Sequence, residues 1–209
     1  MSKQETVFNY YKACNVLKDT IRTGWVDWKV NKERLESVAE HIYGTQMLAI
    51  AMQSEFKYDI DLMKVINMLA IHELGECVIG DFVFYEIDAK EKEKLEHNAV
   101  HDMLSGLMNK DYIEELFLEF DAHETLESKF AYQCDKLECD LQCKLYDMAG
   151  GVDLTKQRSE HAMENEEVKE LIEQGKTWSD MWISFDIDRG LYDDNFKSVA
   201  EYAINCDKE

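Results

Sequence analysis

The absence of proline is the feature that most constrains the fold of this chain. Its 209 residues include no proline and only 9 glycines, so few positions would interrupt a helix. Strand-like alternation of apolar and polar residues is nowhere sustained, whereas apolar residues recur at helical spacing along most of the chain. The sequence therefore predicts an all-α protein.

Length and composition favour a single domain over residues 1–209. A hydrophobic content of 45% is enough to build a core, and no repeat or low-complexity linker divides the chain. No apolar run approaches the roughly 18 residues of a membrane span, and the N-terminus lacks a secretory signal. The six cysteines form no CxxC pair and are expected to be free thiols. We therefore expect a soluble, cytoplasmic protein with no membrane partner.

The charge of the chain restricts its ligands. A formal net charge of −21, with 44 acidic residues, would repel the polyanionic backbone of a nucleic acid. A small anion is a different case, because one metal ion and one or two cationic side chains can hold it in a locally positive pocket.

Helical periodicity divides the chain into segments. Ser37 is a plausible N-cap, and Glu40 completes a capping box at the start of one helix. The final segments, within residues 151–209, are expected to close the bundle. The predicted helices cover approximately residues 5–21, 38–56, 61–73, 89–107, 112–123, 126–148, 160–174, 178–185 and 195–205.

A cluster of ionisable residues follows the apolar face of helix 61–73. His72 and Glu73 fall on the turn after Leu69 and point where an apolar residue is expected. Glu76 lies one turn beyond His72, and Gly80 with Asp81 ends the segment as a turn. Burying an unpaired charge costs several kcal/mol, so a bound metal ion is the simplest source of compensation.

Two further residues extend this cluster. His41 lies early in helix 38–56, and Asp135 lies within helix 126–148. Taken alone, His41 is more often a core residue than a metal ligand, and Glu73 could instead pair with Lys64. As an ordered set, imidazole and carboxylate side chains on three facing helices suit a divalent transition-metal ion.

A second metal site is a weaker hypothesis. His97 and His101 are four residues apart, which is ligand spacing on a helix. The charged run at residues 90–96 favours a solvated helix face instead.

The motifs, in this order and spacing, resemble those of the HD-domain metal-dependent phosphohydrolases. They are most similar to the branch that includes bacterial 5'-deoxynucleotidases, and the resemblance is strongest over residues 10–145. The motifs that carry it are Arg22-Thr-Gly-Trp25, Glu36-Ser-Val-Ala-Glu-His41, His72-Glu-Leu-Gly-Glu76 with Gly80-Asp81, and Asp135-Lys-Leu-Glu138.

The resemblance implies an HD-domain helical bundle that binds one divalent metal ion, namely Mn, Co, Zn, Fe or Mg. The family has aspartate where this chain has Glu73, whose extra methylene would move the carboxylate by about 1.5 Å. A homodimer is also implied. The implied metal ligands are His41, His72, Glu73 and Asp135, the implied substrate-binding residues are Arg22 and Trp25, and the implied catalytic residues are Glu76 and Asp81.

The expected reaction is hydrolysis of a phosphomonoester, a nucleoside 5'-monophosphate, with release of phosphate. One alternative is a non-catalytic HD-fold module that binds a nucleotide or a partner through a drifted metal site. A structural helical adaptor with an acidic surface is the other.

Overall fold

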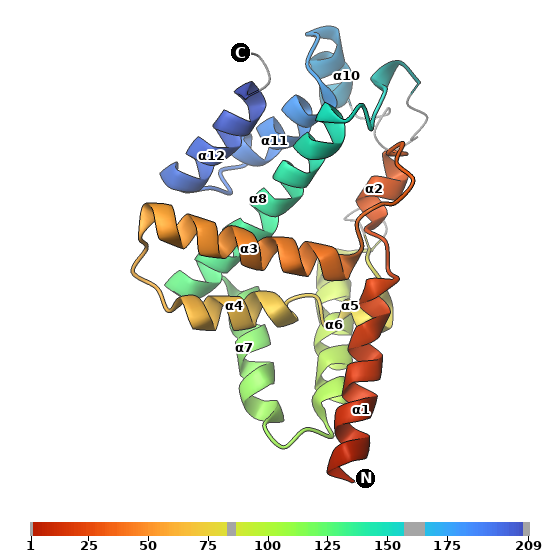
Figure 1. Ribbon diagram of the computed structural model, residues 1–209, viewed down its shortest axis with the longest axis vertical. Coiled ribbons are helices and arrows are strands. Elements are labelled where there is room, and N and C mark those ends of the chain that lie inside the picture. The colour runs from red at the N-terminus through yellow and green to blue at the C-terminus, as the bar shows by residue number, and fades with distance from the viewer. Residues whose placement is uncertain (1, 83–86, 157–165, 207–209) are drawn as a thin grey trace. The chain divides into compact units, whose positions relative to one another are not determined.

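The computed structural model describes residues 2–82, 87–156 and 166–206. Within these ranges every regular element is helical, apart from one isolated bridge between Ile21 and Ser37 (Figure 1). The prediction of an all-α protein is therefore confirmed. The first part of the predicted helix 160–174 lies outside the described residues.

The helices follow one another along the chain with short connections. The predicted bounds of helices 38–56 and 126–148 are confirmed, whereas the predicted helix 5–21 is divided into an α-helix and a 3₁₀ turn. The elements are α1 (Lys3–Cys14), η1 (Asn15–Lys18), α2 (Thr23–Asp27), α3 (Val38–Phe56), α4 (Leu62–Ile71), α5 (Glu76–Ile79), α6 (Ala89–Leu104), α7 (Lys110–Ala122), α8 (Leu126–Met148), η2 (Leu154–Lys156), α10 (Glu166–Glu173), α11 (Trp178–Asp188) and α12 (Asp194–Asn205).

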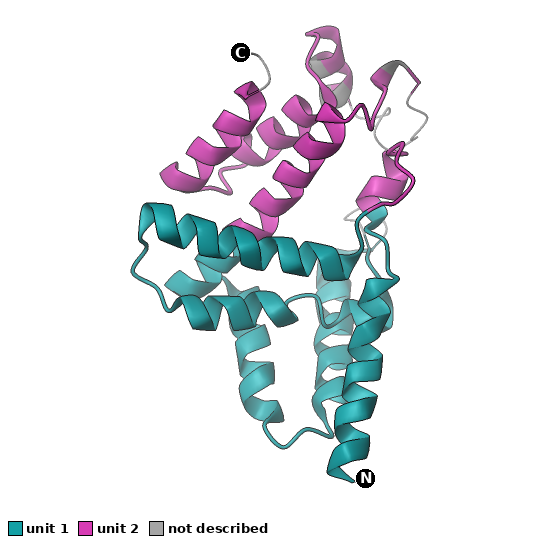
Figure 2. Ribbon diagram, in the orientation of Figure 1, with its two compact units in different colours: residues 1–23, 36–132 teal, residues 24–35, 133–209 magenta. Residues whose placement is uncertain are grey.

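Contacts within the chain group its residues into two compact units (Figure 2). Unit 1 contains residues 1–23 and 36–132, and unit 2 contains residues 24–35 and 133–209. Helix α8 contributes residues to both units. The interpretation of residues 1–209 as one domain stays a prediction.

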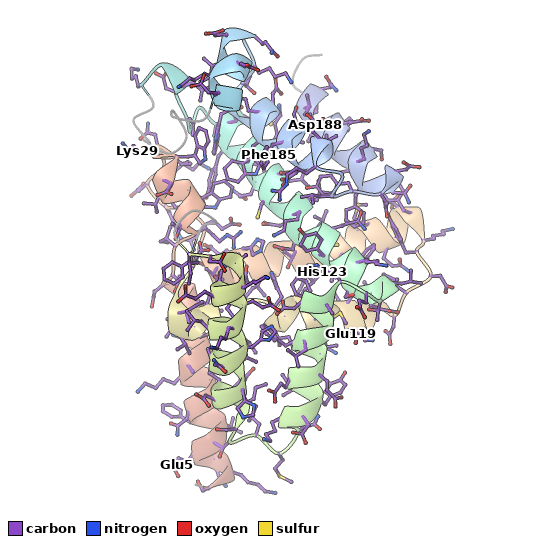
Figure 3. All side chains as sticks on the ribbon, turned by 180° about the vertical axis from the view of Figure 1, so that it is seen from behind. Glu5, Lys29, Glu119, His123, Phe185 and Asp188 are labelled. Atoms are coloured by element: carbon purple, nitrogen blue, oxygen red, sulfur yellow. The ribbon has the colours of Figure 1, made fainter. Side chains whose placement is uncertain are left out.

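Unit 1 is a set of helices packed around α3, α4 and α6. Helix α3 packs on α4, α4 on α7, and α6 on both α5 and α7, while α1 packs on α5 and α6 (Figure 1). An ion pair of 2.6 Å between Lys64 on α4 and Glu119 on α7 supplements this packing. Glu119 is labelled in Figure 3. The core between α5, α6 and α7 contains Leu74, Val100, Leu104 and Phe117.

Unit 2 has a core rich in aromatic side chains. Trp25 and Trp178 are only 2% and 1% exposed, and their rings meet edge to face with centroids 6.1 Å apart. Asp147 on α8 accepts hydrogen bonds from the Ser179 hydroxyl at 2.6 Å and from its backbone N–H at 3.0 Å, which fixes the start of α11. This unit therefore combines aromatic burial with a cap supplied by another helix.

A glycine permits the close approach of α6 to the segment that precedes α5. A Cβ atom at Gly75 would lie 2.7 Å from both Cβ and Cγ of Glu96 on α6. Contacts this short require atoms to move, because real Cβ atoms essentially never show them. The absence of a side chain at Gly75 thus sets how near α6 can lie to the residues around Glu76.

We predict that Gly75→Ala destabilises the protein by about 1–3 kcal/mol, because the added methyl group overpacks this contact. Thermal unfolding measured by circular dichroism checks the prediction, with an expected fall in Tm of several degrees, roughly 2–4 °C per kcal/mol for a chain of this size. Gly24→Ala is the matched control, since its Cβ would meet Trp182 Cη2 at an ordinary 3.6 Å. Equal melting temperatures for the two variants would contradict the close-approach argument.

Candidate metal centre

His41 enters the site from the first turns of α3. Ser37 caps this helix and forms the predicted capping box with Glu40, whose carboxylate accepts the Ser37 backbone N–H at 3.0 Å. His41 follows one turn later and is fully buried. The cap therefore fixes where the helix starts and the direction in which the His41 imidazole points.

His72 is positioned by the end of α4. Apolar periodicity predicts that His72 and Glu73 lie on the helix itself, but α4 ends at Ile71, His72 is its C-cap, and residues 72–75 form a turn. The His72 Nδ1 atom lies 2.8 Å from the Leu69 carbonyl oxygen. If Nδ1–H donates to this carbonyl, which the end of the helix leaves without a helical partner, Nε2 keeps a lone pair for a metal ion.

Glu73 brings a carboxylate to the two imidazoles. Its Oε1 atom lies 3.7 Å from Nε2 of His41 and 3.7 Å from Nε2 of His72, and the two Nε2 atoms are 3.4 Å apart. Glu73 lies in the turn after α4. From this position its carboxylate reaches the histidines, although its side chain is one methylene longer than that of aspartate. Unit 1 thus brings together three of the predicted metal ligands.

The donor set fits a divalent transition-metal ion. Metal–donor bonds of about 2.1 Å in a tetrahedral site place neighbouring donors roughly 3.4 Å apart, and the observed separations are 3.4, 3.7 and 3.7 Å. Both histidines are buried, with His72 7% exposed. Imidazole nitrogen and carboxylate oxygen suit Zn, Mn, Co and Fe, so the set does not select one metal.

Asp135, the fourth predicted ligand, lies on α8 in unit 2. It is 5% exposed, and its carboxylate lies 2.8 Å from Nζ of Lys136. Because the other three predicted ligands belong to unit 1, the role of Asp135 as a metal ligand stays a prediction.

Arg22 is held beside Glu73 by the backbone. The Ile21–Ser37 bridge and a hydrogen bond of 3.1 Å from Arg22 N–H to the Glu36 carbonyl bring residue 22 to the start of α3. The Arg22 guanidinium lies 3.1 Å from Glu73 Oε1. A cation predicted to bind substrate therefore adjoins the three-donor cluster, with its side chain 17% exposed.

Glu76, predicted to be catalytic, is the first residue of α5 and is only 2% exposed. Burial raises the pKa of its carboxyl well above the ordinary value, and the neighbouring Glu73 and Asp81 carboxylates raise it further. Arg22 and Lys92 act in the opposite direction without reversing the rise. Glu76 consequently retains a proton to higher pH than an exposed glutamate does.

Asp81, the other predicted catalytic residue, caps the start of α2. Its Oδ2 atom accepts a hydrogen bond of 2.6 Å from Thr23 N–H, and its backbone carbonyl accepts one of 2.6 Å from the Thr23 hydroxyl. Asp81 therefore connects the end of the α5 segment to the Arg22–Thr23 segment. Whether it also takes part in chemistry stays a prediction.

Trp25, predicted to contact substrate, lies in the aromatic core of unit 2. Its ring centroid is 5.2 Å from that of Trp182 and 5.3 Å from that of Tyr146. Packing accounts for its burial, and its contact with substrate stays a prediction.

The two histidines considered for a second metal site each pair with α7 instead. His97 Nε2 lies 2.7 Å from Asp121 Oδ2, and His101 Nδ1 lies 2.8 Å from Glu114 Oε1. Separate imidazole–carboxylate pairs explain their spacing, because both face the neighbouring helix.

Lys92 on α6 lies beside the site and was not predicted from the sequence. Its Nζ atom lies 3.5 Å from Glu76 Oε1 and 3.3 Å from the Phe82 carbonyl oxygen. The charged run around it favours a solvated helix face. Helical periodicity would have identified it. Glu96 lies one turn, and Lys92 two turns, before Ala99 and Val100 on the same buried face of α6.

Known protein sequences include relatives of this chain. A model of the HD domain family matches residues 14–175. The chain is 36% identical over 147 residues to the 5'-deoxynucleotidase HDDC2 of Dictyostelium discoideum, a match covering 66% of this chain and 76% of that protein. It is 27% identical over 153 residues to the 5'-deoxynucleotidase hdd1 of Schizosaccharomyces pombe, covering 70% and 75% of the two chains.

Solved structures show the same fold at lower identity. The crystal structure of a predicted metal-dependent phosphohydrolase from Magnetospirillum magnetotacticum matches with a TM-score of 0.68 and 18% identity, over 98% of this chain and 95% of that one. A Pyrococcus horikoshii protein matches with a TM-score of 0.60 and 22% identity, over 88% and 97%. With the family model matched over residues 14–175 of 209, the chain belongs to the HD domain family.

Proposed function

We propose that this protein is a metal-dependent 5'-deoxynucleotidase that hydrolyses deoxynucleoside 5'-monophosphates and releases phosphate. The observation that carries the proposal is the cluster of the buried His41 and His72 with the half-buried Glu73, with Arg22 on its edge. The relatives named 5'-deoxynucleotidase support the choice of substrate class.

The proposed metal ligands are His41, His72, Glu73 and Asp135. When bound there, a divalent ion supplies Lewis acidity toward the phosphoryl group and lowers the pKa of water. The residues that hold it also exclude bulk solvent, since both histidines are buried. This burial strengthens the electrostatic interactions at the site.

Arg22 provides positive charge for the phosphate. Its guanidinium already contacts the Glu73 carboxylate at 3.1 Å, and the planar group has further N–H donors suited to phosphate oxygens. Arg22 consequently binds the substrate and stabilises negative charge as the ester bond breaks.

Glu76 is the proposed general acid. Its raised pKa favours the protonated carboxyl, which is the form that can donate a proton to the 5'-oxygen of the departing deoxynucleoside. Asp81 is the second candidate for this role, but its Oδ2 atom is engaged by Thr23 N–H. Trp25 is proposed to contact the nucleoside.

Other properties follow from charge and length. The net charge of −21 argues against nucleic acid as a substrate or partner. Among the helices that the structure describes, none has the length and apolar character needed to cross a bilayer. A cytoplasmic location and a homodimer remain proposals.

The substrate class is tested with a panel of 5'- and 3'-monophosphates, phosphodiesters and single-stranded DNA, each with Mn, Co, Zn and Mg. We expect phosphate release from deoxynucleoside 5'-monophosphates and none from diesters or DNA, because the acidic chain repels polyanions. A colorimetric phosphate assay measures it. Hydrolysis of DNA without hydrolysis of monophosphates would contradict the proposal, and tight nucleotide binding without turnover would favour a non-catalytic module.

The metal site is tested by elemental analysis after chelation and reloading. The wild-type protein should take up about one ion per chain, and His72→Ala should take up much less because it removes an imidazole donor. His101→Ala is the matched control, since this side chain is 57% exposed and bonds to Glu114. Full occupancy in His72→Ala would remove His72 from the site.

The acid role is tested with Glu76→Gln, which keeps the shape of the side chain and removes its transferable proton. We expect kcat to fall by about 100- to 10,000-fold with metal content unchanged. If Glu76 merely supported a metal ligand, the main loss would be roughly 10- to 100-fold in metal affinity. Glu115→Gln, at an exposed position on α7, is the control.

A further inference from the structure

Lys92 connects the segments that flank the candidate centre. Its ammonium lies 3.5 Å from Glu76 Oε1 on α5, 3.5 Å from Glu96 Oε1 one turn along α6, and 3.3 Å from the Phe82 carbonyl oxygen. The side chain is 27% exposed. A single cation thus contacts the proposed general acid and the residue that follows Asp81.

The Glu76 carboxyl is held on one side only. Its Oε1 atom meets Lys92, whereas the buried Oε2 atom has no hydrogen-bond partner in the part of the chain that the structure describes. A buried polar atom without a partner is costly, and a bound substrate is one source of that partner. The contact from Lys92 to Oε1 therefore determines the direction in which Oε2 of Glu76 points.

The close packing of α6 makes this contact possible. Gly75, directly before Glu76, has no side chain to separate its backbone from Glu96. Lys92 lies one turn before Glu96 on the same helix face, so it reaches Glu76 and Phe82 together.

The surroundings of Lys92 keep it charged. Burial would lower the pKa of its ammonium group, but four carboxylates outweigh that effect and raise it. These carboxylates belong to Glu96, Glu76, Glu73 and Asp81. A positive charge here offsets part of the repulsion that the ionised carboxylates of Glu96, Glu73 and Asp81 would exert on a phosphate dianion.

We propose that Lys92 is a positioning residue for the reaction: its ammonium orients the Glu76 carboxyl toward the leaving group and holds the Asp81–Phe82 backbone beside it. This inference rests on the proposed function. Lys92 acts through Glu76 and Phe82, so its removal should slow the chemical step more than it weakens metal or substrate binding.

The structure offers a matched pair of lysines for the test. Lys92→Met and Lys94→Met make the same change on α6, at a half-buried and at an exposed position. We expect Lys92→Met to lower kcat by about 10- to 100-fold with metal content unchanged and KM within a few-fold of wild type, because only the oriented acid is lost. Lys94→Met should match the wild-type protein, and Lys92→Arg should recover part of the activity.

A double-mutant cycle separates positioning from a structural role. If Lys92 acts through Glu76, Lys92→Met should change kcat by less than about threefold in a Glu76→Gln background. Equal effects of Lys92→Met in both backgrounds would overturn the inference.

Chemical rescue gives an independent readout. Lys92 lines a cavity of about 470 Å³, together with Phe82, Ile87, Ala89, Glu93, Glu96 and Asp121. Propylammonium ions can enter such a space, so they should restore activity to Lys92→Ala in a saturable way and leave Lys94→Ala unchanged. Loss of activity without rescue by the amine or by Lys92→Arg would assign Lys92 a structural role and overturn the inference.

The inference can be judged even if the substrate panel shows no turnover. Hydrogen exchange of the backbone amides of residues 76–82 should be faster in Lys92→Met than in Lys94→Met, because the contact to the Phe82 carbonyl is lost. Failure of the proposed function would show as inactivity of the wild-type protein, whereas failure of this inference would show as identical behaviour of the two lysine variants.

Discussion

The structure of this site depends on one constraint: two imidazole nitrogens and one carboxylate oxygen lie within 3.4–3.7 Å of one another in the interior of unit 1. Lone pairs placed this close in a buried environment repel each other unless a cation or a shared proton lies among them. Several local features of the backbone nevertheless bring these three atoms together. Their convergence on one place is the main reason to infer metal binding.

These features are helix ends, a backbone bridge and a glycine. The capping box at Ser37 starts α3 one turn before His41, and the end of α4 leaves a carbonyl at Leu69 that fixes the His72 ring. The Ile21–Ser37 bridge brings Arg22 to the same place. Gly75 then lets α6 approach, which adds Lys92 to the surroundings of Glu76. The site is thus assembled mainly from helix ends, where backbone groups lack helical partners.

Sequence patterns predict those features of the fold and the site that depend on neighbouring residues in the chain. The bounds of α3 and α8 and the Ser37 capping box follow from periodicity and capping chemistry. The early end of α4 was not predicted, because apolar periodicity continues past Ile71, where the His72 Nδ1 atom lies 2.8 Å from the Leu69 carbonyl oxygen. Lys92 was missed because a run of alternating charges resembles a solvated face, although its helical spacing from the buried Ala99 and Val100 indicates the face that packs against α5. The contribution of Asp135 depends on the arrangement of the two units and stays a prediction from sequence.

The most direct test is anomalous diffraction from crystals loaded with manganese or zinc and a deoxynucleoside 5'-monophosphate. We expect one metal peak per chain, bonded to Nε2 of His41, Nε2 of His72 and carboxylate oxygens of Glu73 and Asp135, with the phosphate next to Arg22. A peak held by other residues, or no peak at full metal concentration with the nucleotide bound elsewhere, would contradict it.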